Sequence, residues 1–156
     1  GMAELSEHIL DIRDAQVLSV TSSEEGVEEG IGRIGNLEKP MTLSECCAHV
    51  RHSLKLGSLK VFGDMGRMVY RIAVSPGSGK SAIPVAIEKG ADVLVTGDIG
   101  HHEGLDAVAQ GLAVIDAGHY GTEYIFMDDM RQFLADKLPG LEVETAPVIH
   151  PFQVIP

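Results

Sequence analysis

From residue 59 onward, short apolar runs alternate with segments whose apolar residues recur every three or four positions. Apolar runs rich in Val, Ile and Leu are typical of buried strands, whereas a spacing of three to four is typical of amphipathic helices. The pattern predicts strands at 59–62, 69–74, 93–96 and 113–116, and helices at 81–89, 103–110 and 120–138. This alternation favours an α/β fold, with a layered sheet that is largely parallel or mixed and is covered by helices.

The two ends of the chain have weaker patterns. A helical pattern spans 5–12 and a strand pattern spans 16–20, and the acidic run within 24–29 predicts a solvated turn. The closely spaced glycines of 30–35 predict a tight bend against another backbone segment. At the other end, residues 141–146 predict an edge strand, and the prolines after them predict an extended tail.

One helix start is marked by its own side chains. Thr42 and Glu45 have the spacing of a capping box, and the apolar positions that follow continue with helical spacing to Leu54. His49 and His52 fall beside this apolar face, so we expect both at the surface.

Composition limits the class of protein. With 156 residues, 16.6 kDa and 44% hydrophobic residues, the chain fits a single α/β domain covering 1–156. A net charge of -11, with only twelve Lys and Arg, argues against a nucleic-acid partner. Cys46 and Cys47 are adjacent and have no other cysteine to pair with, and the chain has no signal peptide and no apolar run long enough to span a membrane. We therefore expect a cytoplasmic protein that does not associate with membranes.

The strongest chemical signal is the pair His119 and Glu123, four residues apart where a strand pattern changes to a helical one. This spacing places an imidazole and a carboxylate on one helical face. Met127, Met130 and Leu134 continue that face, so we expect the face to be buried and the pair to bind a divalent metal ion. The alternative is an ordinary hydrogen-bonded couple, because a closed metal site takes about four ligands.

A second group follows the neighbouring strand. Asp98, His101 and His102 come directly after the apolar run that ends near residue 96. In open sheets, ligands collect outside the carboxyl ends of parallel strands, so we expect this group to lie near His119 and Glu123. There it would supply a water-activating base or a proton shuttle. The alternative is a pair of exposed loop histidines.

The glycine-rich loop at 77–81 is not a phosphate-binding P-loop. That motif needs a glycine five positions before the second one, and the residue there is Val74. The loop favours at most a weak anion site at a helix start.

Several segments together resemble the Nif-three-like family, also described as GTP-cyclohydrolase-I-type-2-like. The residues that carry the resemblance are 30–37, the strand 71–74 with its glycine loop, 92–102 and 117–123, in the family's order. The resemblance covers the family's carboxyl-terminal half, from about residue 28 to the end, and leaves 1–27 as a divergent amino-terminal segment. It implies an α/β protein with a dinuclear metal centre, a ring-like homo-oligomer and a hydrolase-like site.

The resemblance also implies roles for individual residues. His119 and Glu123 match the family's carboxyl-terminal metal ligands, for Zn, Mn, Fe or Ni, and Asp98, His101 and His102 match residues that line the cleft. Asp98 stands where most members are expected to have Glu. The His-His pair and the Asp that members contribute from their amino-terminal half have no equivalent here, so the metal site is partial. The chain is a naturally short relative, is completed by a second subunit, or is an excised domain.

Three functions remain open at this point. The first is a metal-dependent hydrolase of a small, nucleotide-like substrate, with a metal-activated water and His101 or His102 moving protons. The second is a non-catalytic regulatory or protein-interaction module with a vestigial metal site or a small effector. The third is a purely structural oligomer. The partners expected are further copies of the chain, a small molecule, and a protein that supplies the missing ligands.

Overall fold

The computed structural model describes residues 1–25, 27–153 and 155. Its centre is a six-stranded mixed sheet with the order β1-β2-β4-β5-β6-β3. Strands β4, β5 and β6 are parallel to one another, and the other three pairings are antiparallel. The predicted α/β fold with a mixed sheet is confirmed. The strands are β1 (Arg13–Glu24), β2 (Val27–Thr42), β3 (Lys60–Phe62), β4 (Met68–Ser78), β5 (Val93–Gly97) and β6 (Ala113–Asp116).

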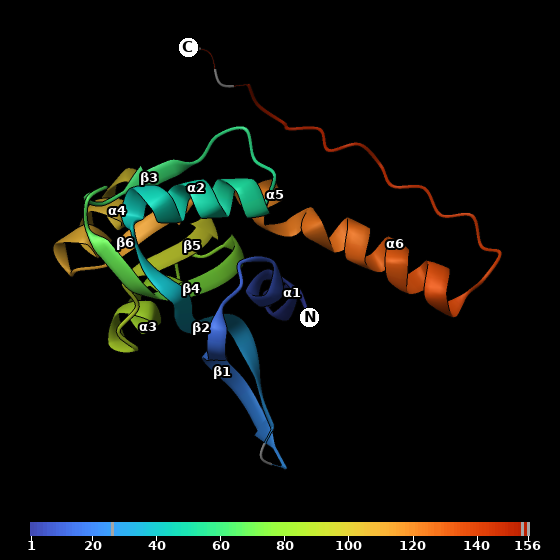
Figure 1. The fold of residues 1–156 in the computed structure, drawn as a ribbon, viewed down its shortest axis with the longest axis horizontal. Coiled ribbons are helices and arrows are strands. Elements are labelled where there is room, and N and C mark those ends of the chain that lie inside the picture. Colours follow the sequence, from blue (N-terminus) through green and yellow to red (C-terminus); the bar gives the residue numbers. More distant parts are fainter. Residues whose placement is uncertain (26, 154, 156) are drawn as a thin grey trace.

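Helices cover both faces of the sheet (Figure 1). Helices α1 (Met2–Ile9) and α2 (Leu43–Ser53) cover one face. Helices α3 (Ala82–Glu88) and α4 (His101–Ala109) cover the other. Each face has its own cluster of buried side chains, with Ile72, Val93 and Ile115 on the first and Ala73, Leu94 and Val114 on the second.

The sequences of β5 and β6 are nearly all apolar because of where these strands lie in the sheet. Every residue of β5 and β6 is buried. A parallel strand covered by helices on both faces has no solvent side, so it reads as a continuous apolar run rather than an alternation. The predicted strand 113–116 is confirmed residue for residue, and 93–96 is extended by Gly97.

The capping box predicted for α2 is confirmed. Thr42 Oγ1 accepts a hydrogen bond from the Glu45 amide at 3.2 Å, and the Glu45 carboxylate accepts one from the Thr42 amide at 3.0 Å. His52 is exposed as expected. His49 is half-buried instead, because its Nε2 lies 2.9 Å from the Leu10 carbonyl oxygen at the end of α1.

The amino-terminal hairpin is longer than the sequence pattern indicated. The strand expected at 16–20 is part of β1, and the glycines at 30–35 lie inside β2 rather than in a bend. Their close approach to a neighbouring backbone is real, since a Cβ at Gly30 would lie 2.0 Å from the Ser19 carbonyl oxygen. The predicted acidic turn is reduced to a short connection at Glu25, because Glu28 already pairs within the hairpin; Gly26 lies outside the described residues.

The predicted helix at 120–138 is two helices, α5 (His119–Glu123) and α6 (Ile125–Lys137). Helix α6 leaves the body of the molecule (Figure 1), and only Ile125 of this helix is buried. Met127, Met130 and Leu134 were expected to face a core, but they are only half-buried, because the sheet does not extend beneath them.

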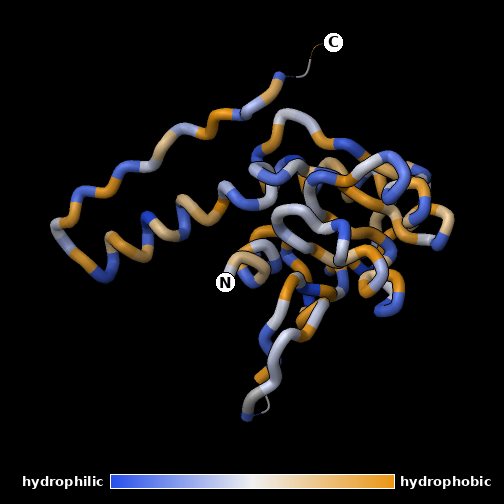
Figure 2. The backbone as a smooth tube through the Cα atoms, turned by 180° about the vertical axis from the view of Figure 1, so that it is seen from behind, coloured by the Kyte–Doolittle hydropathy of each residue, from blue (hydrophilic) through white to orange (hydrophobic). Residues whose placement is uncertain are grey.

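The predicted edge strand at 141–146 is wrong. This segment forms no strand and continues into an extended tail that contains Pro147 and Pro151, whereas Pro156 lies outside the described residues. The tail turns back from the far end of α6 towards the body, and apolar positions recur along both segments (Figure 2). Within the described residues, no helix has both the length and the apolar character needed to cross a bilayer.

The buried cysteines give a direct test of this core. Burial, with a smaller contribution from the neighbouring Cys47, raises the pKa of Cys46 to about 12, and burial also raises the pKa of Cys47. Because the thiolate is the reactive form, we expect both thiols of the native protein to react slowly with iodoacetamide at neutral pH. Mass spectrometry should show rapid labelling only after unfolding in guanidinium chloride. Fast labelling of the native protein would contradict the packing of α2.

Candidate functional site

The carboxyl ends of the three parallel strands meet at one edge of the sheet, as expected. A glycine stands at or near each end: Gly77 in β4, Gly97 in β5 and Gly118 two residues after β6. A Cβ on Gly97 would lie 2.6 Å from the Gly118 carbonyl carbon and 2.8 Å from the Gly77 carbonyl oxygen. The three loops therefore touch through their backbones, and this contact brings residues far apart in the sequence together.

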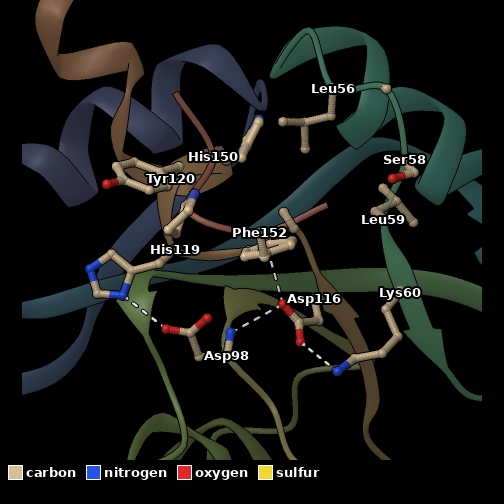
Figure 3. A pocket seen from close by; sticks show the side chains of 15 residues that line it. Leu56, Ser58, Leu59, Lys60, Asp98, Asp116, His119, Tyr120, His150 and Phe152 are labelled. Carbon is tan, nitrogen blue, oxygen red and sulfur yellow. Dashed lines mark hydrogen bonds and ion pairs between the residues drawn. The ribbon is translucent and has the colours of Figure 1, made fainter. Parts of the chain in front are cut away.

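His119, the first residue of α5, has a carboxylate at each ring nitrogen. Its Nδ1 lies 3.0 Å from Asp98 Oδ2, and its Nε2 lies 3.1 Å from Glu123 Oε2. Figure 3 shows the bond to Asp98 at the border of a pocket. The side chains of His119, Asp98 and Glu123 are 49%, 53% and 41% exposed, so the expectation of a buried pair is wrong. They lie at the rim because α5 begins where the sheet ends.

The two contacts of His119 cannot both be hydrogen bonds of a neutral imidazole. A neutral ring has one N–H donor and one acceptor nitrogen. If Nδ1 donates to Asp98, Nε2 is an acceptor that lies 3.1 Å from a carboxylate oxygen of Glu123, which is an acceptor as well. A proton or a cation can be shared by the two groups. A metal-binding histidine characteristically donates its other N–H to a carboxylate, and the Asp98 contact fits that pattern.

Gly77 makes the room that this pair needs. It has a φ of +76°, and a Cβ there would lie 2.8 Å from Glu123 Oε1. Its amide donates to Thr122 Oγ1 at 2.9 Å, and that hydroxyl lies 3.2 Å from the Gly118 carbonyl oxygen. Residues 77–78 belong to β4, so Gly77 of this glycine-rich segment supports α5 from the end of that strand.

Asp116, the last residue of β6, was not recognised as a site residue from the sequence. Its buried carboxylate accepts hydrogen bonds from the amides of Asp98 at 3.1 Å, Ile99 at 2.9 Å and Gly118 at 3.0 Å. It also pairs with Lys60 Nζ at 3.0 Å (Figure 3). Asp116 therefore fixes the loop that carries Asp98 and the loop that carries His119. The sequence did contain one sign of this role, because Asp116 is a single carboxylate at the end of an otherwise apolar strand.

His101 and His102 lie in the first turn of α4, where both are exposed. Their rings contact each other edge to face, with centroids 5.5 Å apart. Neither lines the pocket beside His119. Next to them, the hydrogen bond from Lys80 Nζ to Glu103, 2.8 Å long, lowers the pKa of Glu103 and raises the pKa of Lys80.

An open pocket of about 700 Å³ lies beside His119 (Figure 3). The segment before β3 and the first residues of α5 form two of its sides, and the carboxyl-terminal tail forms another. Its polar border includes Lys60, Asp98, Asp116 and His119. Among the described residues, no three His, Cys, Asp or Glu side chains are arranged to hold a metal ion, so His119 and Glu123 offer two ligands at most.

Comparison with known proteins decides the family. A model of the family described as Duf34/NIF3 (NGG1p interacting factor 3) matches residues 1–151. The chain belongs to the Duf34/NIF3 family. The resemblance inferred from residues 30–37, 92–102 and 117–123 is confirmed, and the family match also includes residues 1–27.

Relatives of the Duf34/NIF3 chain support the assignment at the level of sequence and fold. A Clostridium acetobutylicum protein named "GTP cyclohydrolase 1 type 2 homolog" is 39% identical over 118 residues, which are 76% of this chain and 44% of that protein. A Streptococcus pneumoniae protein of the same name is 40% identical over 116 residues, 72% of this chain and 43% of that protein. The chain thus spans less than half of either relative.

A solved structure of a Bacillus cereus protein related to NIF3 shares the fold, with a TM-score of 0.88 at 20% identity. The similarity covers 99% of this chain and 70% of that one. The described arrangement of sheet and helices is therefore that of Duf34/NIF3 proteins.

The role of Asp116 can be tested by its removal. Asp116→Ala leaves three backbone donors without their acceptor and Lys60 without its ion-pair partner, and we expect it to lower the free energy of unfolding by about 3 kcal/mol. Urea unfolding followed by circular dichroism measures this loss. The matched control is Asp106→Ala on the exposed side of α4, which should change stability by less than about 0.5 kcal/mol. Equal effects of the two substitutions would show that Asp116 does not hold the loops.

Proposed function

We propose that the chain binds a divalent metal ion through His119 Nε2 and Glu123, as part of a metal-dependent hydrolase that acts on a small, nucleotide-like substrate. The observation that carries the proposal is the approach of Nε2 to a carboxylate oxygen while Nδ1 is engaged by Asp98. Two ligand atoms of a tetrahedral zinc ion, each about 2.0–2.2 Å from the metal, stand about 3.3–3.6 Å apart. The 3.1 Å separation of Nε2 and Oε2 is a little shorter, and a small rotation of the partly exposed Glu123 side chain would bring both atoms to that geometry.

The neighbouring residues have distinct tasks in this proposal. Asp98 accepts the Nδ1 proton, which fixes the ring orientation and leaves Nε2 free as a ligand. Gly77 and Thr122 hold α5 against the end of β4, so that Glu123 stays within reach of the same position. A bound divalent ion would supply Lewis acidity and lower the pKa of a coordinated water.

His101 and His102 are proposed to move protons at the rim of the site. Both are exposed in the first turn of α4, close in sequence to Asp98, so their ring nitrogens are open to solvent. They do not border the pocket, so they would serve only a substrate that extends over the β5–α4 loop.

The metal ligands other than His119 and Glu123 are proposed to come from another part of a longer polypeptide or from a second subunit. The matched relatives are more than twice as long as the matched segment, so in such proteins a further part of the polypeptide is available to supply ligands. A second copy in a homo-oligomer is the other source. Either source would cover the exposed side of His119 and Glu123, since 49% and 41% of those side chains face solvent.

A non-catalytic regulatory or protein-interaction module is the second candidate. Within the described residues only two ligands gather, and two ligands seldom give tight metal binding. Helix α6 also carries exposed Phe126 and Phe133 away from the body, as a protein-binding surface would. Bound metal without hydrolysis of nucleotides would favour this candidate.

The metal proposal predicts a specific loss in His119→Ala. Removing Nε2 leaves Glu123 as the one ligand, so we expect zinc or manganese affinity to fall at least about tenfold. Isothermal titration of chelator-treated protein measures the affinity, and elemental analysis of freshly purified protein measures occupancy. The matched control is His52→Ala, which removes an exposed histidine from α2 and should bind as the native protein does. Unchanged affinity in His119→Ala would remove this residue from the proposed site.

Asp98→Asn tests the orienting bond. The amide retains the size of the side chain and can still accept a hydrogen bond, but it no longer offers a negative charge to Nδ1–H. We expect metal affinity to fall about 10- to 100-fold, with no change in the ratio of bound metal to protein at saturation. A competition titration against a chromogenic zinc chelator measures this change. Native affinity in the variant would mean that Asp98 does not orient His119 for metal binding.

A further inference from the structure

The carboxyl-terminal tail borders both sides of α5. Residues 150–152 line the 700 Å³ pocket next to His119, and residues 146–149 line a smaller pocket of about 340 Å³ next to Glu123. Tyr120 belongs to both linings. The tail, which contains no helix or strand, thus passes beside both His119 and Glu123, the two residues proposed to hold the metal.

Three rings follow one another on this tail side of the larger pocket. The Tyr120 and His150 rings meet nearly edge to face with centroids 6.0 Å apart, and the His150 and Phe152 rings are tilted by 47° with centroids 6.1 Å apart. We call Tyr120, His150 and Phe152 the aromatic wall. Tyr120 and Phe152 remain 46% and 64% exposed, so much of their ring surface is open to a ligand.

The rest of the pocket is suited to one kind of ligand. Leu56 and Leu59 add apolar surface, and Lys60 and Asp98 place a cation and a carboxylate on the border. Figure 3 shows the side chains of Tyr120, Phe152, Asp116 and Lys60 around this one pocket. Flat π surface next to a few charged groups favours a planar ring with polar edges, because a ring can stack while its edge atoms form hydrogen bonds.

The tail itself is weakly attached. Within the described residues, its last backbone hydrogen bond runs from the Leu141 amide to the Leu138 carbonyl oxygen. Beyond that point side-chain contacts such as those of the aromatic wall hold it. Segments with few buried contacts and few hydrogen bonds open at low cost in free energy. A ligand that stacked on the wall would add contacts to the tail and hold it over the pocket.

We propose that the aromatic wall binds a planar nitrogen heterocycle, such as the base of a nucleotide, and that the tail is the specificity element of the pocket. This proposal names the substrate class of the site and so rests on the proposed function. It requires nothing of the metal for binding of the ring, because the wall lies on the tail side of His119 and contains neither proposed ligand. Base binding and metal binding can therefore be measured separately.

The test compares two probes that differ only in the base, guanosine 5′-monophosphate and ribose 5-phosphate. Both are titrated into the chelator-treated full chain by isothermal calorimetry. Stacking of a base on an aromatic side chain supports a preference of about tenfold for the nucleotide, and we expect Phe152→Leu to abolish that preference. Phe152→Tyr, which keeps a ring, should retain it. Ile155→Ala is the matched control, because Ile155 is an exposed apolar residue of the same tail that does not line the pocket.

The outcomes separate this proposal from the metal proposal. Base preference that persists in His119→Ala supports the wall, even if the native protein proves to bind no metal. Equal affinity for the two probes, no binding of either, or a Phe152→Leu variant that keeps the native preference would overturn it. Tighter nucleotide binding after truncation at residue 147 would also overturn it, since the tail would then obstruct the pocket. Native-like circular dichroism of each variant confirms that the chain is folded.

Discussion

The carboxylate of Asp116 accepts hydrogen bonds from three backbone amides and pairs with Lys60, and the candidate site depends on these bonds. Asp98 adopts a positive φ of 58°, which is unfavourable for a residue with a side chain. Its amide is held by Asp116, so the strained conformation and the direction of its carboxylate are fixed together. The same carboxylate holds the Gly118 amide, from which α5 begins. One residue that touches no proposed metal ligand therefore sets the positions of Asp98 and His119.

The parts of the fold that could be predicted are those set by local pattern. Strands β5 and β6 are apolar because helices cover both of their faces, and that burial is visible in the sequence as a continuous run. Helix α2 begins where Thr42 and Glu45 can bond each other's backbone, which is a property of four consecutive residues. The meeting of Asp98 with His119 could also be anticipated, because parallel strands place their carboxyl ends at the same edge.

The parts that could not be predicted depend on what surrounds an element. The helical spacing of Met127, Met130 and Leu134 is real, but spacing does not reveal whether a sheet lies beneath the helix, and for most of α6 none does. The glycines of β2 resemble a bend in sequence, whereas their purpose is to let β1 approach closely. Asp116 was missed for a similar reason. Its three amide donors lie at sequence distances of 2 to 18 residues and converge only when β5 and β6 pair.

The candidate site is partly exposed, which is consistent with its having only two proposed metal ligands among the described residues. A chain that closed a metal site by itself would bury the ligands, because the remaining donors would surround the ion. Here His119 and Glu123 are oriented by Asp98, Gly77 and Thr122 but remain open on one side. In the proposed metal site, the fold would thus supply orientation, which lowers the entropy cost of binding, while affinity would require groups that approach from the open side. The tail borders the pockets on both sides of α5. In the proposal it therefore restricts which ligands reach the open side of His119 and Glu123.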